Sequence, residues 1–197
     1  MDEAVARALA RWPDVPSVYG WLRLTRLGEW RIKDDPIANA SVSAFIGRNY
    51  AHDQRGRWFF QNGPQRVFVT LDYTPLVYRA DPGAGYLCHT GAAARRVGGA
   101  WLDDGGSLLL LTEHGVGVVA DRDLHHVLAQ IIGPAGAPAD DEELAAALAA
   151  ARAGGDTGLR LRAGAAPVPI AGIAAAEVPR RFGFDPDPRP APGEPAC

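Results

Sequence analysis

Cysteine is scarce in this sequence of 197 residues, and no charge of either sign dominates it. The two cysteines are Cys88 and Cys197, and Cys197 closes a proline-rich segment, so we expect no structural disulfide and a reducing compartment. A formal net charge of −3 argues against a nucleic-acid polymer or an anionic membrane as partner. No apolar run approaches the roughly 20 residues needed to span a bilayer. Because the acidic, amphipathic opening MDEAVARALARW is not a secretory signal, we expect a cytoplasmic protein.

The familiar motifs of catalysis and metal binding are also missing. The sequence contains no CxxC, HxxxH or HExxH spacing, no GxSxG nucleophile elbow and no Walker loop. His125 and His126 are adjacent, so on a helix they point about 100° apart and do not form the i, i+4 pair of a metal site. The segment GVGVVA satisfies G-x-G-x-x-A, but Val118 and Val119 favour a strand over the helix that a dinucleotide site needs. We therefore expect no cofactor and no metal; an enzyme of unrecognised type is kept as an alternative.

The overall composition is that of a globular protein, with 47% hydrophobic and 22% charged residues. A first helix is predicted from the acidic start to Trp12, where Pro13 and Pro16 stop it. Alternating apolar residues over 20–32 then predict a hairpin. Three- and four-residue spacings of Val42, Phe45, Ile46 and Asn49 predict a short helix, with Asn39 or Ser41 as its N-cap.

The densest aromatic cluster of the chain lies directly beside its densest cluster of amides, in RGRWFFQNGPQRVFVTLDYTP. This stretch predicts strands over 57–61 and 65–73, joined around Asn62-Gly63, which is the strongest short hairpin signal. Pro64 has no N–H group, so the second strand is expected to begin at a sheet edge or after a bulge. Further strands are predicted over 76–79 and 86–90, around a turn at Asp81-Pro82-Gly83.

The order of hairpin and helix is repeated in the second half of the chain. A strand carrying Trp101 turns at 104–106 and returns through 108–111, and after an inserted strand at 115–119 a helix begins at Asp121 or Asp123. The predicted apolar face of this helix consists of Leu124, Val127, Leu128 and Ile131. The repeated pattern favours an internal duplication.

Beyond Pro134 the sequence predicts an alanine-rich helix from Asp140, a strand at GLRLRAG and, from Phe184, a proline-rich tail without fixed structure. The predicted class is α+β, with two small antiparallel sheets that each carry a helix. The predicted organisation is a first half over 1–80, a second half over 81–183 and the tail over 184–197.

The segments LGEWRIKDDPI, RNYAHD and GRWFFQNGPQRVFV…YTPLVY carry a family resemblance. The chain resembles an uncharacterised, mostly proteobacterial family of unknown function and, more distantly, an uncharacterised bacterial family of two domains. The likeness covers roughly Gly20 to Gln130. It implies a duplicated motif, a second half similar to a pleckstrin-homology barrel, and a ligand-binding or signalling role for a nucleotide-like molecule at the domain interface. Where the distant family has Pro-Val-Glu, this chain has Gly63-Pro64-Gln65 and lacks the carboxylate.

Two interpretations of the aromatic–amide cluster stay open: the amides satisfy the backbone of a turn, or they form the rim of a pocket with an aromatic floor. On the second interpretation the chain is a cytoplasmic regulatory module that binds a small anionic or nucleotide-like ligand, in the cleft between the halves. An adaptor that captures a protein through the strand edge at Pro64 is the other alternative. The predicted ligand-binding residues are Arg48, Asn49, Tyr50, His52, Asp53, Arg57, Trp58, Phe60, Gln61, Asn62 and Arg66.

Overall fold

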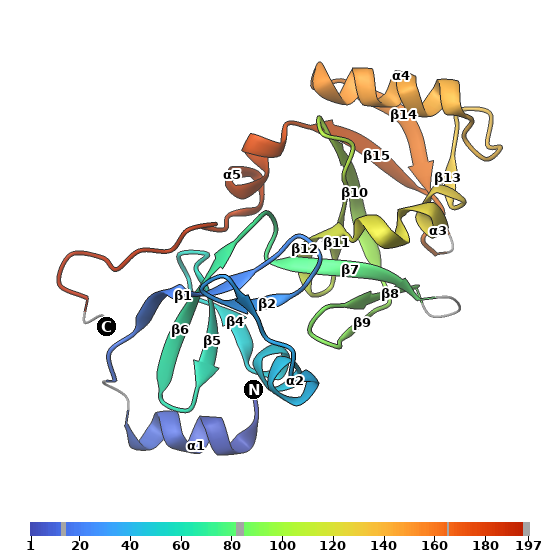
Figure 1. Cartoon of the computed structure of the whole chain (residues 1–197). Helices are drawn as coiled ribbons and strands as arrows, with labels where there is room; N and C mark the ends of the chain where they lie inside the picture. The colour runs from blue at the N-terminus through green and yellow to red at the C-terminus, as the bar shows by residue number, and fades with distance from the viewer. Residues whose placement is uncertain (13–14, 82–84, 165, 195–197) are drawn as a thin grey trace. The chain divides into compact units, whose positions relative to one another are not determined.

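The computed structural model describes residues 1–12, 15–81, 85–164 and 166–194 (Figure 1). The chain divides into two compact units. The first comprises Met1–Pro75, His89–Gly91 and Gly183–Cys197, and the second comprises Leu76–Cys88 and Ala92–Phe182. Each unit contains one β-sheet together with helices, which confirms the predicted α+β class. Pro13, most of the predicted turn at Asp81-Pro82-Gly83, and Cys197 lie outside the described residues.

The sheet of the first unit has the strand order β3-β2-β1-β6-β5-β4. Its strands are β1 (Val18–Leu24), β2 (Trp30–Ile32), β3 (Asp35–Pro36), β4 (Tyr50–His52), β5 (Trp58–Asn62) and β6 (Gln65–Leu71). β1 and β6 run parallel, and the other neighbours in the order are antiparallel. β6 therefore lies inside the sheet, between β1 and β5. The strand after Pro64 was expected to begin at a sheet edge or after a bulge. It does neither: β6 lies inside the sheet and pairs with β5 without a register shift, because the turn, which needs no N–H from Pro64, accommodates the proline.

The turn of the β5–β6 hairpin lies one residue later than predicted. Asn62 pairs with Gln65, so the two loop residues are Gly63 and Pro64. Gly63 has φ of 57°, and a glycine with positive φ followed by proline suits a type II′ turn, in which only the first central residue needs positive φ.

The two helices of the first unit begin as their sequences predict. α1 spans Glu3–Arg11 and α2 spans Ala40–Arg48. Asn39 caps α2, because its Oδ1 accepts hydrogen bonds from the backbone N–H groups of Ser41 (2.9 Å) and Val42 (3.2 Å). In the core of this unit, Leu24, Phe68 and Val69 are buried. Burial of these apolar side chains holds the central strands together.

The sheet of the second unit is larger than predicted and curls into a half-barrel. Its strand order is β13-β14-β15-β10-β11-β12-β7-β8-β9, with parallel pairs at β10–β15 and β12–β7. Three consecutive leucines, Leu108 to Leu110, are all buried, so both faces of β11 are covered. The strands are β7 (Leu76–Asp81), β8 (Gly85–Cys88), β9 (Ala93–Ala94), β10 (Val97–Asp103), β11 (Leu108–Thr112), β12 (Gly115–Val119), β13 (Ile131–Ile132), β14 (Asp156–Leu161) and β15 (Val168–Ile173).

The helices of the second unit differ from the prediction at one point. The helix after Asp123 was expected to include Ile131, but α3 spans only Leu124–Leu128, and Ile131 lies in β13, where it pairs with Leu161. Pairing and burial of Ile131 in the sheet override its helical spacing. The remaining helical elements are η1 (Asp121–Asp123), α4 (Asp141–Arg152), η2 (Ala175–Glu177) and α5 (Val178–Phe182).

The proline-rich segment was expected to lack fixed structure, yet residues 183–194 make specific contacts within the first unit. The N–H of Asp185 donates to the carbonyl of Gly56 (3.0 Å), and the N–H of Leu71 donates to the carbonyl of Pro186 (2.8 Å). Phe184 is buried. The segment forms no core of its own, and the first unit supplies one for it.

Candidate functional site

Arg57, one of the residues predicted to bind an anion, already has carboxylate partners within the first unit. Its Nε donates to Asp53 (2.8 Å), and its Nη1 donates to Glu194 (2.8 Å) and to the hydroxyl of Tyr19 (3.1 Å). Arg57 is only 9% exposed. These hydrogen bonds, with Glu194 contributing most, raise the pKa of Arg57, and the hydrogen bond from Arg57 lowers the pKa of Glu194 to about 2.

The predicted amides mainly serve the backbone. Gln61 is fully buried, and its Nε2 donates to the carbonyl of Gly63 (2.9 Å), which ties the β5–β6 turn. Asn49 is also buried; its Oδ1 accepts from the N–H of Asp2 (2.7 Å), and its amide donates to the carbonyl of Phe45 (2.9 Å). Both amides thus form hydrogen bonds with main-chain groups of their own unit.

The predicted aromatic residues pack on one another. Tyr50 lies 4.8 Å from Trp58 and 5.1 Å from Trp30 between ring centroids, and His52 lies 4.9 Å from Trp58. The hydroxyl of Tyr50 donates to the carbonyl of Pro75 (3.1 Å). These residues form a packed aromatic cluster of the first unit.

The two remaining predicted arginines lie on the surface of the first unit. Arg48 is 3.3 Å from the carboxylate of Asp2. The guanidinium of Arg66 covers the ring of Phe59, 4.8 Å from its centroid. The eleven predicted residues therefore form several small contacts rather than one polar site.

Phe60 and Asn62 do line a cavity, but it is an apolar one. This apolar groove, of about 470 Å³, lies between β1, β2, β5 and β6 on one side and α2 on the other, and its lining includes Trp21, Ile32, Val42, Phe45 and Val67. No charged side chain lines it among the described residues. A small anion therefore has no charged partner among the described residues that line this groove.

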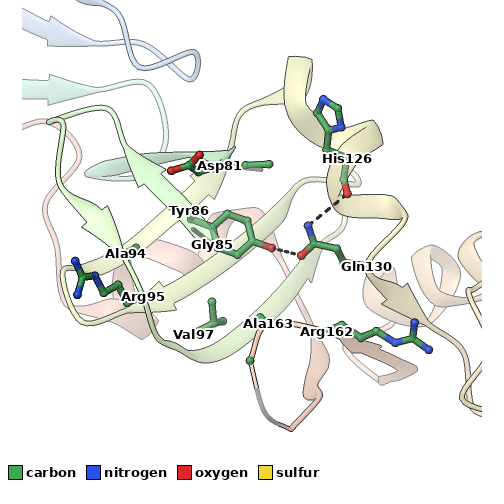
Figure 2. A pocket seen from close by; sticks show the side chains of 12 residues that line it. Asp81, Gly85, Tyr86, Ala94, Arg95, Val97, His126, Gln130, Arg162 and Ala163 are labelled. Atoms are coloured by element: carbon green, nitrogen blue, oxygen red, sulfur yellow. Dashed lines mark hydrogen bonds between the residues drawn. The ribbon is translucent and has the colours of Figure 1, made fainter. Parts of the chain in front are cut away.

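A more polar pocket of about 500 Å³ lies in the second unit (Figure 2). We call it the arginine pocket. It is lined from β7, β8, β9, β10, α3 and the segment after β14, and its polar side chains are those of Asp81, Tyr86, Arg95, His126, Gln130 and Arg162. Figure 2 shows Arg95 and Arg162 on either side of the pair formed by Tyr86 and Gln130. The lining thus includes two arginines, one on each side of a central tyrosine and amide, and in this view their guanidinium groups extend away from that pair.

The centre of the arginine pocket is held by hydrogen bonds. The hydroxyl of buried Tyr86 donates to Oε1 of Gln130 (3.3 Å), and Nε2 of Gln130 donates to the carbonyl of His126 (3.5 Å). Burial raises the pKa of Tyr86 to about 12, so its hydroxyl stays protonated at neutral pH. The carbonyl of Gln130 accepts from the N–H of Arg162 (2.9 Å), which fixes the backbone on which that arginine lies.

The two arginines keep most of their hydrogen-bonding capacity. Nη2 of Arg162 donates to the carbonyl of Gly136 (3.1 Å). In the part of the chain that the structure describes, neither Arg95 nor Arg162 forms an ion pair. Glu113 accepts from the backbone N–H groups of Arg95 (2.8 Å) and Arg96 (3.1 Å), and these bonds, together with one from its own N–H, lower the pKa of Glu113 to about 2. Glu113 therefore orders the backbone at Arg95 without neutralising its guanidinium through a direct ion pair.

The arginine pocket could not be recognised from the sequence. Its residues come from segments spread over 80–164, and no spacing within any one of them is characteristic of a binding motif. The adjacent basic residues Arg95 and Arg96 were the one signal in the sequence. Among the described residues no group of three metal-ligating side chains gathers, and no helix there is long and apolar enough to cross a membrane.

The fold and the pocket together define an α+β protein of two sheet-containing units. A family model described as "Protein of unknown function (DUF2946)" matches residues 1–189. The chain belongs to this family, which confirms the predicted resemblance to an uncharacterised family. The match extends beyond the predicted range of Gly20 to Gln130 at both ends.

Two solved structures resemble the chain. A DUF1285 family protein from Silicibacter pomeroyi DSS-3 has a TM-score of 0.54 and 13% identity, over 87% of this chain and 96% of that chain. A DUF1285 family protein from Shewanella baltica OS155 has a TM-score of 0.42 and 19% identity, over 57% of this chain and 91% of that chain. The first likeness concerns the fold alone. No curated protein matches the chain.

Proposed function

We propose that this protein binds a small anionic, nucleotide-like molecule in the arginine pocket and acts as a cytoplasmic regulatory module. The observation that carries the proposal is the presence of two arginines without ion-pair partners among the described residues, in the lining of one pocket of about 500 Å³. Pockets for small ligands typically measure about 300–1,000 Å³. Guanidinium groups bind phosphate and carboxylate through paired hydrogen bonds.

Each polar residue of the pocket has a distinct part in this proposal. Arg95 and Arg162 supply positive charge for the anionic group. Gln130 supplies an amide for a hydrogen-bonding edge such as that of a nucleobase, and Tyr86 holds this amide in place. Asp81 is a hydrogen-bond acceptor on the pocket wall and disfavours a ligand that carries negative charge at every end.

The proposal keeps the ligand class expected from the sequence and changes the residues that bind it. Arg57 is a poor partner for an external anion, because the carboxylates of Asp53 and Glu194 already occupy its guanidinium. An incoming ligand would have to displace Glu194 first. Arg95 and Arg162 carry no such cost.

The test is a thermal-shift panel of nucleoside mono-, di- and triphosphates and cyclic nucleotides, with the uncharged nucleosides as controls. At a concentration 100 times its dissociation constant, a ligand stabilises the folded state by about 2.7 kcal/mol, which corresponds to a rise in Tm of about 5 to 10 °C for a chain of this size. We expect this rise from at least one nucleotide and from no nucleoside.

Matched variants locate the site. Arg95→Ala and Arg162→Ala should abolish most of the shift, whereas Arg160→Ala should keep it, since Arg160 is exposed on β14 and does not line the pocket. The proposal fails if no nucleotide stabilises the protein, or if Arg160→Ala loses the shift as completely as the other two variants.

A further inference from the structure

We infer that the apolar groove of the first unit is a separate binding site for an amphiphile with an apolar chain and a terminal carboxylate. The groove measures about 470 Å³, and aromatic and branched aliphatic side chains form most of its wall. Its volume falls in the range of small-ligand sites, and its lining excludes the polar ligand proposed for the arginine pocket.

Large hydrophobic side chains are left exposed around this groove. Trp21 is 51% exposed, Ile32 is 48% exposed and Val42 is 42% exposed, and all three line the same cavity. They come from β1, β2 and α2, so the tertiary fold rather than one local segment brings them together. Scattered exposed hydrophobic residues are ordinary, but exposed residues that gather around one cavity indicate a surface that an apolar ligand covers.

The carboxylate is inferred from Lys33. Its Nζ lies 4.6 Å from the ring centroid of Trp21, and Trp21 lines the groove. Lys33 forms no ion pair within the described residues. The Lys33 ammonium does not itself line the groove, but it lies over a ring that does, and it complements a molecule that carries one negative charge at the end of a chain.

The first experiment titrates sodium decanoate by calorimetry and a brominated decanoate by quenching of tryptophan fluorescence. Val42→Asp places a negative charge in the groove and should weaken decanoate binding by about tenfold or more. Leu27→Asp is the matched control, because Leu27 is 42% exposed and does not line the groove. The affinity of this variant for decanoate should stay within about twofold of that of the wild type. Trp21→Phe should remove most of the quenching, since Trp21 is the one tryptophan among the described residues that line the groove.

The second experiment separates the contribution of the ligand's alkyl chain from that of its carboxylate. Lys33→Ala should weaken decanoate about threefold, as expected for an exposed ion pair, and should leave decanol binding unchanged. Equal loss for both ligands overturns the role of the carboxylate. The inference is overturned if decanoate does not bind, or if Leu27→Asp weakens decanoate binding as much as Val42→Asp does. It is also overturned if sedimentation and quenching measurements show a concentration-dependent dimer that buries Trp21, because the groove then belongs to the interface with a second copy of the chain.

Discussion

Nη1 of Arg57 lies 2.8 Å from a carboxylate oxygen of Glu194, although 137 positions separate the two residues in the sequence. The same guanidinium donates from Nε to Asp53 (2.8 Å). Arg57 thus connects the C-terminal segment to the sheet of the first unit, and the anion that it recognises is a side chain of its own protein. This finding moves the proposed ligand site to arginines that have no such partner.

Arg57→Ala should destabilise the protein by about 2 to 4 kcal/mol, because it leaves two carboxylates without their counter-charge in a partly buried place. Urea unfolding monitored by tryptophan fluorescence measures the change. Arg55→Ala is the control, since Arg55 is exposed two residues away; its effect should stay within about 0.5 kcal/mol. Equal effects of the two substitutions would contradict the importance of the Arg57 contacts.

The stabilisation that the ion pair of Arg57 and Glu194 provides should depend on pH. The pKa of Glu194 is lowered from 4.5 to about 2 in the folded protein, so the folded state binds fewer protons than the unfolded state. Its stabilising contribution is complete above about pH 4.5 and is lost as the pH falls from 4.5 towards 2. The difference in unfolding free energy between the wild type and Glu194→Gln should therefore be largest at neutral pH and shrink over this range. A difference independent of pH would argue against this ion pair.

Gly56 should tolerate no larger residue. It has φ of 74°, and an added Cβ would lie 2.0 Å from the carbonyl oxygen of Gly183. Gly20 has a similar φ of 71° but open space around the Cβ position. Its substitution therefore measures the cost of the positive φ alone, without a steric clash. Gly20→Ala should cost about 1 to 2 kcal/mol, and Gly56→Ala should cost clearly more and release the segment after Gly183. Limited proteolysis at residues 184–194 together with urea unfolding provides the measurement, and equal costs would exclude a close approach of Gly183.

His126 and His125 offer a matched pair for the arginine pocket. Both lie in α3, but only His126 lines the pocket. His126→Ala should weaken the most strongly bound nucleotide of the thermal-shift panel by about threefold, the size of one lost hydrogen bond. His125→Ala should leave the affinity unchanged, and the reverse order would mean that the nucleotide binds elsewhere.

The local elements were predictable because their signals are local. Asn39 before α2 and the capping box of Asp140 and Glu143 at α4 act within three residues of chain. The two-sheet α+β class followed from the alternating and helical patterns of apolar residues.

The contacts between distant segments were not predictable in the same way. The parallel pairing of β1 with β6 depends on the whole sheet, and it places in the interior a strand that was expected to begin at an edge or after a bulge. Arg57 and Glu194 meet only because the first unit supplies a surface for the proline-rich segment. The arginine pocket depends on Arg95, between β9 and β10, and on Arg162, which follows β14. The spacing of residues in the sequence carries no information about such long-range contacts.

The most direct test of the arginine pocket is a calorimetric titration that compares the nucleotide with the largest thermal shift to its parent nucleoside. With the wild type and Arg160→Ala, the nucleotide should bind at least about tenfold more tightly than the nucleoside. The Arg95→Ala/Arg162→Ala double variant should lose this preference. A preference that survives unchanged in the double variant would contradict the proposed anion site.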